Sequence, residues 1–94
     1  MTLETTTFDA AEYLDTSEAI AAYLADAVED GAPGALAQAI GTVARAKGMS
    51  AIATETGLGR ESLYKSLREG GDPKISTVSK VLSTMGVKLS VEPV

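Results

Sequence analysis

Cysteine and histidine are absent from this 94-residue sequence, and only four residues are aromatic. Without cysteine there is no disulfide, and without either residue there is no thiolate or imidazole metal site. The same absence excludes nucleophilic catalysis through a Ser–His or Cys–His pair. Carboxylates are numerous, but none is predicted to share a cleft with a basic partner. We therefore expect a protein that is not an enzyme and that carries no metal or cofactor.

Long apolar runs are also lacking. None approaches the roughly 20 residues that a membrane-spanning helix needs, and residues 1–4 lack the basic region of a signal peptide. We expect a cytoplasmic protein without a membrane segment. Because 45% of residues are apolar but few are aromatic, the core must consist of Ala, Leu, Ile and Val. Abundant Ala favours helices, since it loses no side-chain entropy there.

The charge is divided unevenly along the chain. The net charge is −5, yet residues 1–33 hold eight acidic and no basic residues, whereas residues 34–94 hold eight basic and five acidic ones. Such asymmetry indicates two surfaces with two partners. The basic part is suited to phosphate, and the acidic part either meets something basic or only keeps an exposed segment soluble.

The periodicity predicts an all-α fold of about five short helices, with a short C-terminal β-strand. Residues 1–15 read as an extended arm, and residues 16–94 as a single helical domain. Thr16 or Ser17 caps a first helix that ends near Asp30, before Gly31. Pro33 opens a second helix that Gly48 ends.

Three shorter elements and a strand follow. Ser50 is a plausible N-cap for a helix over residues 51–56, and another helix is expected over residues 60–68. A Gly- and Pro-containing loop leads to a last helix, capped by Ser76 or Thr77 and ended by Gly86. Residues 87–92 alternate apolar and polar side chains, the period of a half-buried strand.

Residues 49–68 predict a helix-turn-helix. Two short helices that cross through a tight turn need a small residue at the crossing, which Ala53 supplies, and a residue tolerant of positive φ four positions later, which is Gly57. Core-facing positions around the turn are apolar: Ile52, Leu58, Leu63 and Leu67. An ordinary helical hairpin is the alternative.

The second helix of such a motif places its first residues against base edges in the major groove. Arg60 is suited to guanine O6 and N7, and Glu61 either accepts from cytosine or orients Arg60. Tyr64 and Lys65 reach base or phosphate, unless Tyr64 packs beneath the helix. We expect phosphate contacts from Ser50, Ser62 and Arg68.

Several stretches together resemble the addiction-module antidote proteins, which are HigA-like antitoxins with a Cro/repressor-type helix-turn-helix of the lambda-repressor-like fold. The most specific are Ala44-Arg45-Ala46-Lys47-Gly48-Met49-Ser50 and Arg60-Glu61-Ser62-Leu63-Tyr64-Lys65. The likeness extends from Phe8 to Val91. Gly59 departs from the pattern, since a capping residue with a hydroxyl is expected there; Gly is an acceptable N-cap.

The resemblance implies the antitoxin of a type II toxin–antitoxin module. Such a protein neutralises a small basic RelE/HigB-like toxin, usually an mRNA-cleaving endonuclease, by direct binding. It also represses its own operon as a homodimer on palindromic operator DNA. We assign toxin contact to the larger apolar residues of the acidic part: Phe8, Tyr13, Leu14, Ile20, Tyr23 and Leu24.

Other functions and two dimer interfaces stay open. A stand-alone Cro-type repressor without a toxin is the first alternative, and an adaptor that has lost DNA binding is the second. Because a two-fold operator is read by a two-fold protein, we expect a dimer. Its interface is either the strand over residues 87–91, which would otherwise be an exposed edge, or the last helix, with Val78, Val81 and Met85.

Overall fold

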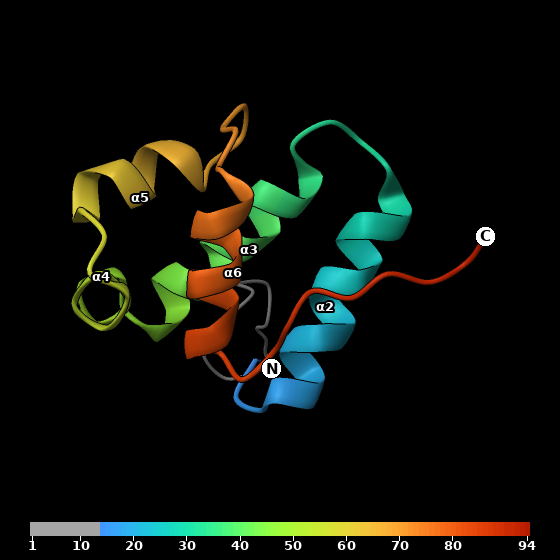
Figure 1. Cartoon of the computed structure of the whole chain (residues 1–94), viewed down its shortest axis with the longest axis horizontal. Helices are drawn as coiled ribbons and strands as arrows, with labels where there is room; N and C mark the ends of the chain where they lie inside the picture. The colour runs from blue at the N-terminus through green and yellow to red at the C-terminus, as the bar shows by residue number, and fades with distance from the viewer. Residues whose placement is uncertain (1–13) are drawn as a thin grey trace, which may run out of the picture.

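The computed structural model describes residues 14–94, and in this part the backbone forms five α-helices and no strand (Figure 1). The helices are α2 (Ser17–Asp30), α3 (Ala35–Lys47), α4 (Met49–Thr56), α5 (Arg60–Ser66) and α6 (Ile75–Thr84). The predicted all-α class is thus confirmed for residues 14–94. No helix of this part has the length and hydropathy of a bilayer-crossing segment.

The first helix has the predicted bounds, whereas the second begins later than predicted. The Thr16 hydroxyl caps α2 by accepting a hydrogen bond from the Ala19 N–H at 3.0 Å, and Gly31 ends it with a φ of 70°. Pro33 does not open α3. Gly34 follows it with a φ of 79° and is the N-cap, and this left-handed conformation prevents helical backbone before Ala35.

The three remaining helices also differ from the prediction at their ends. Gly48 is the N-cap of α4, so Ser50 lies within the helix and does not cap it. Helix α5 ends at Ser66 and not at Arg68, because the backbone of Leu67 leaves helical geometry as its side chain enters the core. Lys74 is the N-cap of α6, so neither Ser76 nor Thr77 caps it.

The predicted C-terminal strand is absent. The Val87 N–H donates to the Leu82 carbonyl, and beyond it the chain runs along α2 without a sheet partner in residues 14–94 (Figure 1). Val87 packs partly against the core, but Leu89 and Val91 are exposed. The alternating pattern is present, but a strand also requires a neighbouring ladder of hydrogen bonds.

The core is aliphatic, as the composition predicts, and α3 lies at its centre. Helix α3 contacts α2 and α4, and α4 also contacts α5 and α6. Ile40, Val43 and Ala44 of α3 are completely buried. Around them pack buried residues from each of the other helices and from the segment before α2: Leu14, Ile20, Leu24, Ile52, Leu63, Leu67, Val81 and Leu82.

A close backbone approach joins α3 to the end of α5. A methyl group on Gly41 would overlap the backbone carbonyl of Leu67. The Arg45 guanidinium donates a hydrogen bond to that same carbonyl oxygen at 3.3 Å. Because α3 is the central helix, these two contacts set where α5 ends and hence which of its faces points outward.

Candidate functional site

The turn between α4 and α5 has the chemistry that the sequence predicted for it. Gly57 ends α4 with a φ of 75°, and its N–H donates to the Ala53 carbonyl at 2.9 Å. Ala53 is buried, and Leu58 packs partly against the core. The Thr56 hydroxyl accepts from the Leu58 N–H at 3.2 Å. The turn is therefore held at both ends, and α5 leaves it in a defined direction.

Helix α5 buries one face and exposes the other. Leu63 and Leu67, which is the C-cap, are 1% and 0% exposed. All the residues that the sequence analysis assigned to DNA contact have exposed side chains: Ser50 on α4, Arg60, Glu61, Ser62, Tyr64 and Lys65 on α5, and Arg68 just after it. The structure brings the α5 residues together on one surface. That they bind DNA stays a prediction.

Two residues of this surface form a contact that the sequence analysis did not identify. The Arg60 guanidinium carbon lies 5.3 Å from the centre of the Tyr64 ring, within the range of a cation–π interaction. The four-residue spacing was the available signal, since side chains at i and i+4 meet on a helix. Tyr64 is still 38% exposed, so it does not pack beneath the helix.

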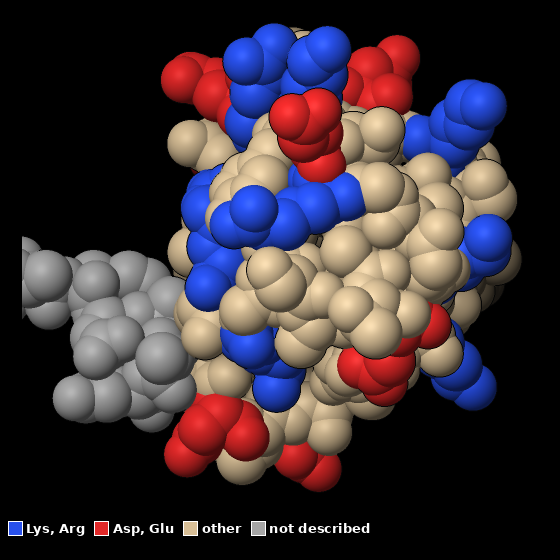
Figure 2. All heavy atoms as spheres, turned by 90° about the vertical axis from the view of Figure 1, so that its left-hand side faces the viewer, with Lys and Arg blue, Asp and Glu red and all other residues tan. Residues whose placement is uncertain are grey.

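The surface around α4 and α5 is mostly basic. Residues 45–68 contain five basic and two acidic side chains. In Figure 2, which faces the side where α4 and α5 lie, Lys and Arg atoms run across the upper part and down both edges. Acidic atoms lie at the upper and lower rim, with one group among the upper basic ones and another on the lower right of the face. Such a distribution favours a polyanionic partner.

The opposite charge gathers on and beside α2. Asp15, Glu18, Asp26, Glu29 and Asp30 are all exposed, and no basic residue occurs between positions 14 and 44. In Figure 1, α2 lies on the side of the molecule away from α4 and α5. The division of charge along the chain is therefore only partly a division in space, because Lys88 lies beside α2 and Lys47 lies beside Asp15.

The predicted toxin-contact residues that the structure describes differ in the burial of their side chains. Leu14, Ile20 and Leu24 are 2%, 1% and 6% exposed and belong to the core, while Tyr23 is half-buried. Phe8 and Tyr13 lie outside the described residues. Toxin contact by these six residues stays a prediction, which the burial of three of them does not favour.

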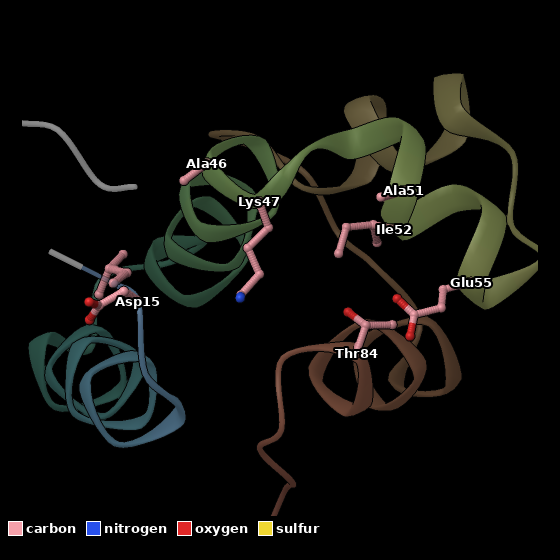
Figure 3. Close-up of a pocket in the computed structure, with 8 residues that line it drawn as sticks. Asp15, Ala46, Lys47, Ala51, Ile52, Glu55 and Thr84 are labelled. Atoms are coloured by element: carbon pink, nitrogen blue, oxygen red, sulfur yellow. The ribbon is translucent and has the colours of Figure 1, made fainter. Parts of the chain in front are cut away.

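An open cleft of about 410 Å³ lies between the segment before α2, the end of α3, α4 and the end of α6 (Figure 3). Leu14 and Ile52 contribute apolar lining, and Asp15, Lys47 and Glu55 contribute charged side chains. The Lys47 side chain extends into the space between the two carboxylates (Figure 3). Nowhere in residues 14–94 do three or more acidic side chains group as metal ligands. The cleft is separate from the exposed face of α5.

Comparison with known proteins identifies a matching family and a relative. Residues 4–93 match a family model described as "Probable addiction module antidote protein". The chain is also 37% identical over 92 residues to an uncharacterized protein of Haemophilus influenzae, covering 98% of this chain and 95% of that protein. No solved structure matches.

Proposed function

This chain belongs to the addiction module antidote family, and we propose that it neutralises a small basic toxin and represses its own operon by binding operator DNA. The toxin is of the RelE/HigB-like class, as the resemblance in the sequence implies. DNA binding and toxin binding use two separate surfaces. The exposed face of α5 meets DNA, and the acidic side at α2 meets the toxin.

The observation that carries the DNA-binding part is the geometry of the α4–α5 unit. A left-handed glycine closes α4, and α5 then buries Leu63 while exposing Arg60, Tyr64 and Lys65. This is what a helix-turn-helix requires, with the second helix presenting its N-terminal residues to the major groove. Arg60, as the first residue of α5, has the best position for a bidentate contact to guanine.

The observation that supports the toxin-binding part is the acidic surface. The carboxylates of α2 and Asp15 are exposed and outnumber the two basic side chains beside them, Lys47 and Lys88. A basic toxin would be steered toward this side, because complementary charge raises the rate of encounter. The apolar component of the interface would come from the half-buried Tyr23 and the exposed Val28.

We further propose that the protein acts as a homodimer on a palindromic operator, since one recognition helix covers only a half-site. Both interfaces considered for it lose support, since residues 87–91 form no strand in the described part of the chain. Val78, Val81 and Met85 of the α6 region are 9%, 0% and 4% exposed within the single chain, so they offer little surface to a second copy.

DNA binding is tested by titrating the duplex upstream of the protein's own gene at several salt concentrations. We expect affinity to fall steeply with salt, with a slope reflecting several phosphate contacts. Arg60→Ala should cost about 1–3 kcal/mol and relax specificity at one base pair. Lys88→Ala, on the C-terminal segment beside α2, is the matched control. Equal losses from both variants, or no binding by the native protein, would contradict the assignment.

Toxin binding is tested by isolating the full-length protein from its native host and identifying any stoichiometric partner. We expect a small basic protein encoded beside this gene. Deleting residues 1–30 is not a suitable test, because Ile20 and Leu24 would be lost from the core. Recovery of the protein without any stoichiometric partner, but with operator binding intact, would support a stand-alone repressor instead.

A further inference from the structure

Arg60 contacts the Tyr64 ring but makes no side-chain hydrogen bond within residues 14–94. Its central carbon lies 5.3 Å from the ring centroid, so the ring engages the guanidinium as a cation. Within residues 14–94, arginine side chains donate hydrogen bonds only at Arg45 and Arg68. The N–H groups of Arg60 are therefore available to a ligand while the position of the group is restrained.

We propose that Tyr64 is a positioning residue that holds the Arg60 guanidinium ready for a guanine edge, and that it does not itself contact DNA. The inference rests on the proposed DNA-binding function and deepens it. It predicts that the operator has a guanine opposite Arg60. Recognition of that guanine would depend on Tyr64, which contacts no base.

The physical basis is the flexibility of an arginine at the start of a helix. An exposed arginine has many rotamers, and binding must select one of them at a cost in entropy. An interaction that already favours the binding-competent arrangement reduces this cost. The contact is made to the ring, and within residues 14–94 Arg60 donates no hydrogen bond to the Tyr64 hydroxyl, so its donors can pair with guanine O6 and N7.

The other charged neighbours on α5 do not hold Arg60 in this way. Glu61 and Lys65 are exposed on the same helix. Glu61 follows Arg60 directly, and adjacent residues do not face each other on a helix. Lys65 is like-charged and cannot attract the guanidinium. Of these three neighbours, only Tyr64 lies one full turn onward with its ring beside Arg60.

A double-mutant cycle separates positioning from direct contact. Tyr64→Ala, Arg60→Ala and the double variant are titrated against the duplex that the native protein protects upstream of its gene. At an exposed site, we expect Tyr64→Ala to weaken binding about two- to fivefold. In the Arg60→Ala background the same change should have no further effect, because the residue that Tyr64 positions is gone. Tyr64→Phe should keep the native affinity for the duplex, because the ring and not the hydroxyl makes the contact with Arg60.

A second measurement uses duplexes in which the guanine read by Arg60 is replaced. Tyr64→Ala should reduce discrimination at that base pair alone and leave the salt slope unchanged. Lys65→Ala is the matched control for a phosphate contact: it should weaken all duplexes alike and lower the salt slope by about one. Thermal unfolding of each variant shows whether α5 is intact.

The outcomes distinguish this inference from the function on which it rests. If the native protein binds no upstream DNA with base discrimination, the proposed function fails. If it binds and the two substitutions have additive effects, Tyr64 contacts DNA independently and the inference alone is overturned. Failure of Tyr64→Phe to restore affinity also overturns it, because the hydroxyl would then be the functional group.

Discussion

Helices α2 and α5 are each anchored in the same core by two large aliphatic side chains. Their exposed faces differ in charge and in the contacts that orient them. Ile20 and Leu24 hold α2, and Leu63 and Leu67 hold α5 and its C-terminal end. The outer face of α2 is acidic, whereas that of α5 is mainly basic and polar. One small core thus presents two surfaces of opposite sign.

The two helices are also oriented by different means. Helix α2 runs for 14 residues with a side-chain N-cap, so local sequence and its apolar stripe define it. Helix α5 has seven residues and no side-chain cap. Its direction depends on the Gly57 turn at one end and on the contact of Gly41 and Arg45 with Leu67 at the other. The basic face therefore depends more on tertiary contacts than the acidic face does.

The largest expected effect tests whether α2 is part of the core as well as a surface. Leu24→Ala should lower the free energy of unfolding by about 2–5 kcal/mol, because truncating a buried leucine leaves a cavity. Val28→Ala on the same helix is the control; Val28 is 58% exposed, and a change within about 0.5 kcal/mol is expected. Urea unfolding measures both. Similar effects at the two positions would mean that α2 is not anchored as described.

The next effect tests how α5 is oriented. Gly41→Ala should lower the free energy of unfolding by about 1–3 kcal/mol, because the added methyl meets the rigid Leu67 backbone rather than a side chain that can move. Operator affinity should fall with it as α5 is displaced. Gly59→Ala is the control for a methyl that meets no backbone, since its Cβ would be 3.6 Å from the Ser62 hydroxyl; only the smaller cost of alanine at the N-cap of α5 is expected there. Native stability in Gly41→Ala would show that the approach is looser than described.

A third expected effect concerns the acidic residues of α2 and the rate of association with the toxin. Replacing Asp26, Glu29 and Asp30 by the corresponding amides should slow association with the toxin about tenfold at low salt, because electrostatic steering is lost. The difference should shrink as salt rises, while DNA affinity and stability stay close to native. Glu69→Gln with Asp72→Asn, in the loop before α6, is the control. Stopped-flow measurements give the association rate of each variant with the toxin. Equal slowing by the α2 variant and the loop variant would argue against a role for α2.

The smallest expected effect concerns Gly59, the N-cap residue of α5. Gly59→Ser should raise the free energy of unfolding by a few tenths of a kcal/mol, because the hydroxyl can cap α5 where no side-chain cap exists. Operator affinity should also rise if the new hydroxyl meets a phosphate at the helix N-terminus. Thermal unfolding measures the first change and a DNA titration the second. A less stable variant would indicate that the Gly59 backbone cannot accommodate a capping side chain.

Much of the fold was predictable because strong local signals marked it. The apolar stripe and the glycine at position 31 predicted α2 with its observed ends, and the paired Ala53 and Gly57 predicted the α4–α5 turn. Capping residues were predicted less well. Ser50, Ser76 and Thr77 have suitable side chains, but Gly48 and Lys74 occupy the cap positions, since the path of the preceding loop decides where a helix begins.

The candidate site was predictable in composition and less so in arrangement. Sequence periodicity placed Arg60, Tyr64 and Lys65 on the outer face of α5, and the structure has them exposed. It did not separate surface from core on α2, where Ile20 and Leu24 are buried. An apolar residue in an acidic segment has the same signature whether it faces a partner or the protein's own core.

The sequence by itself determined the helical class, the aliphatic core, the division of charge and the position of the turn at Gly57, because each depends on composition or on contacts within a few residues. Only the tertiary structure decided three further features: that residues 87–94 have no sheet partner in the described part of the chain, that α5 ends against Gly41 and Arg45, and that Leu14 belongs to the core. Those features depend on residues distant in sequence, and local patterns carry no information about which distant residues will meet.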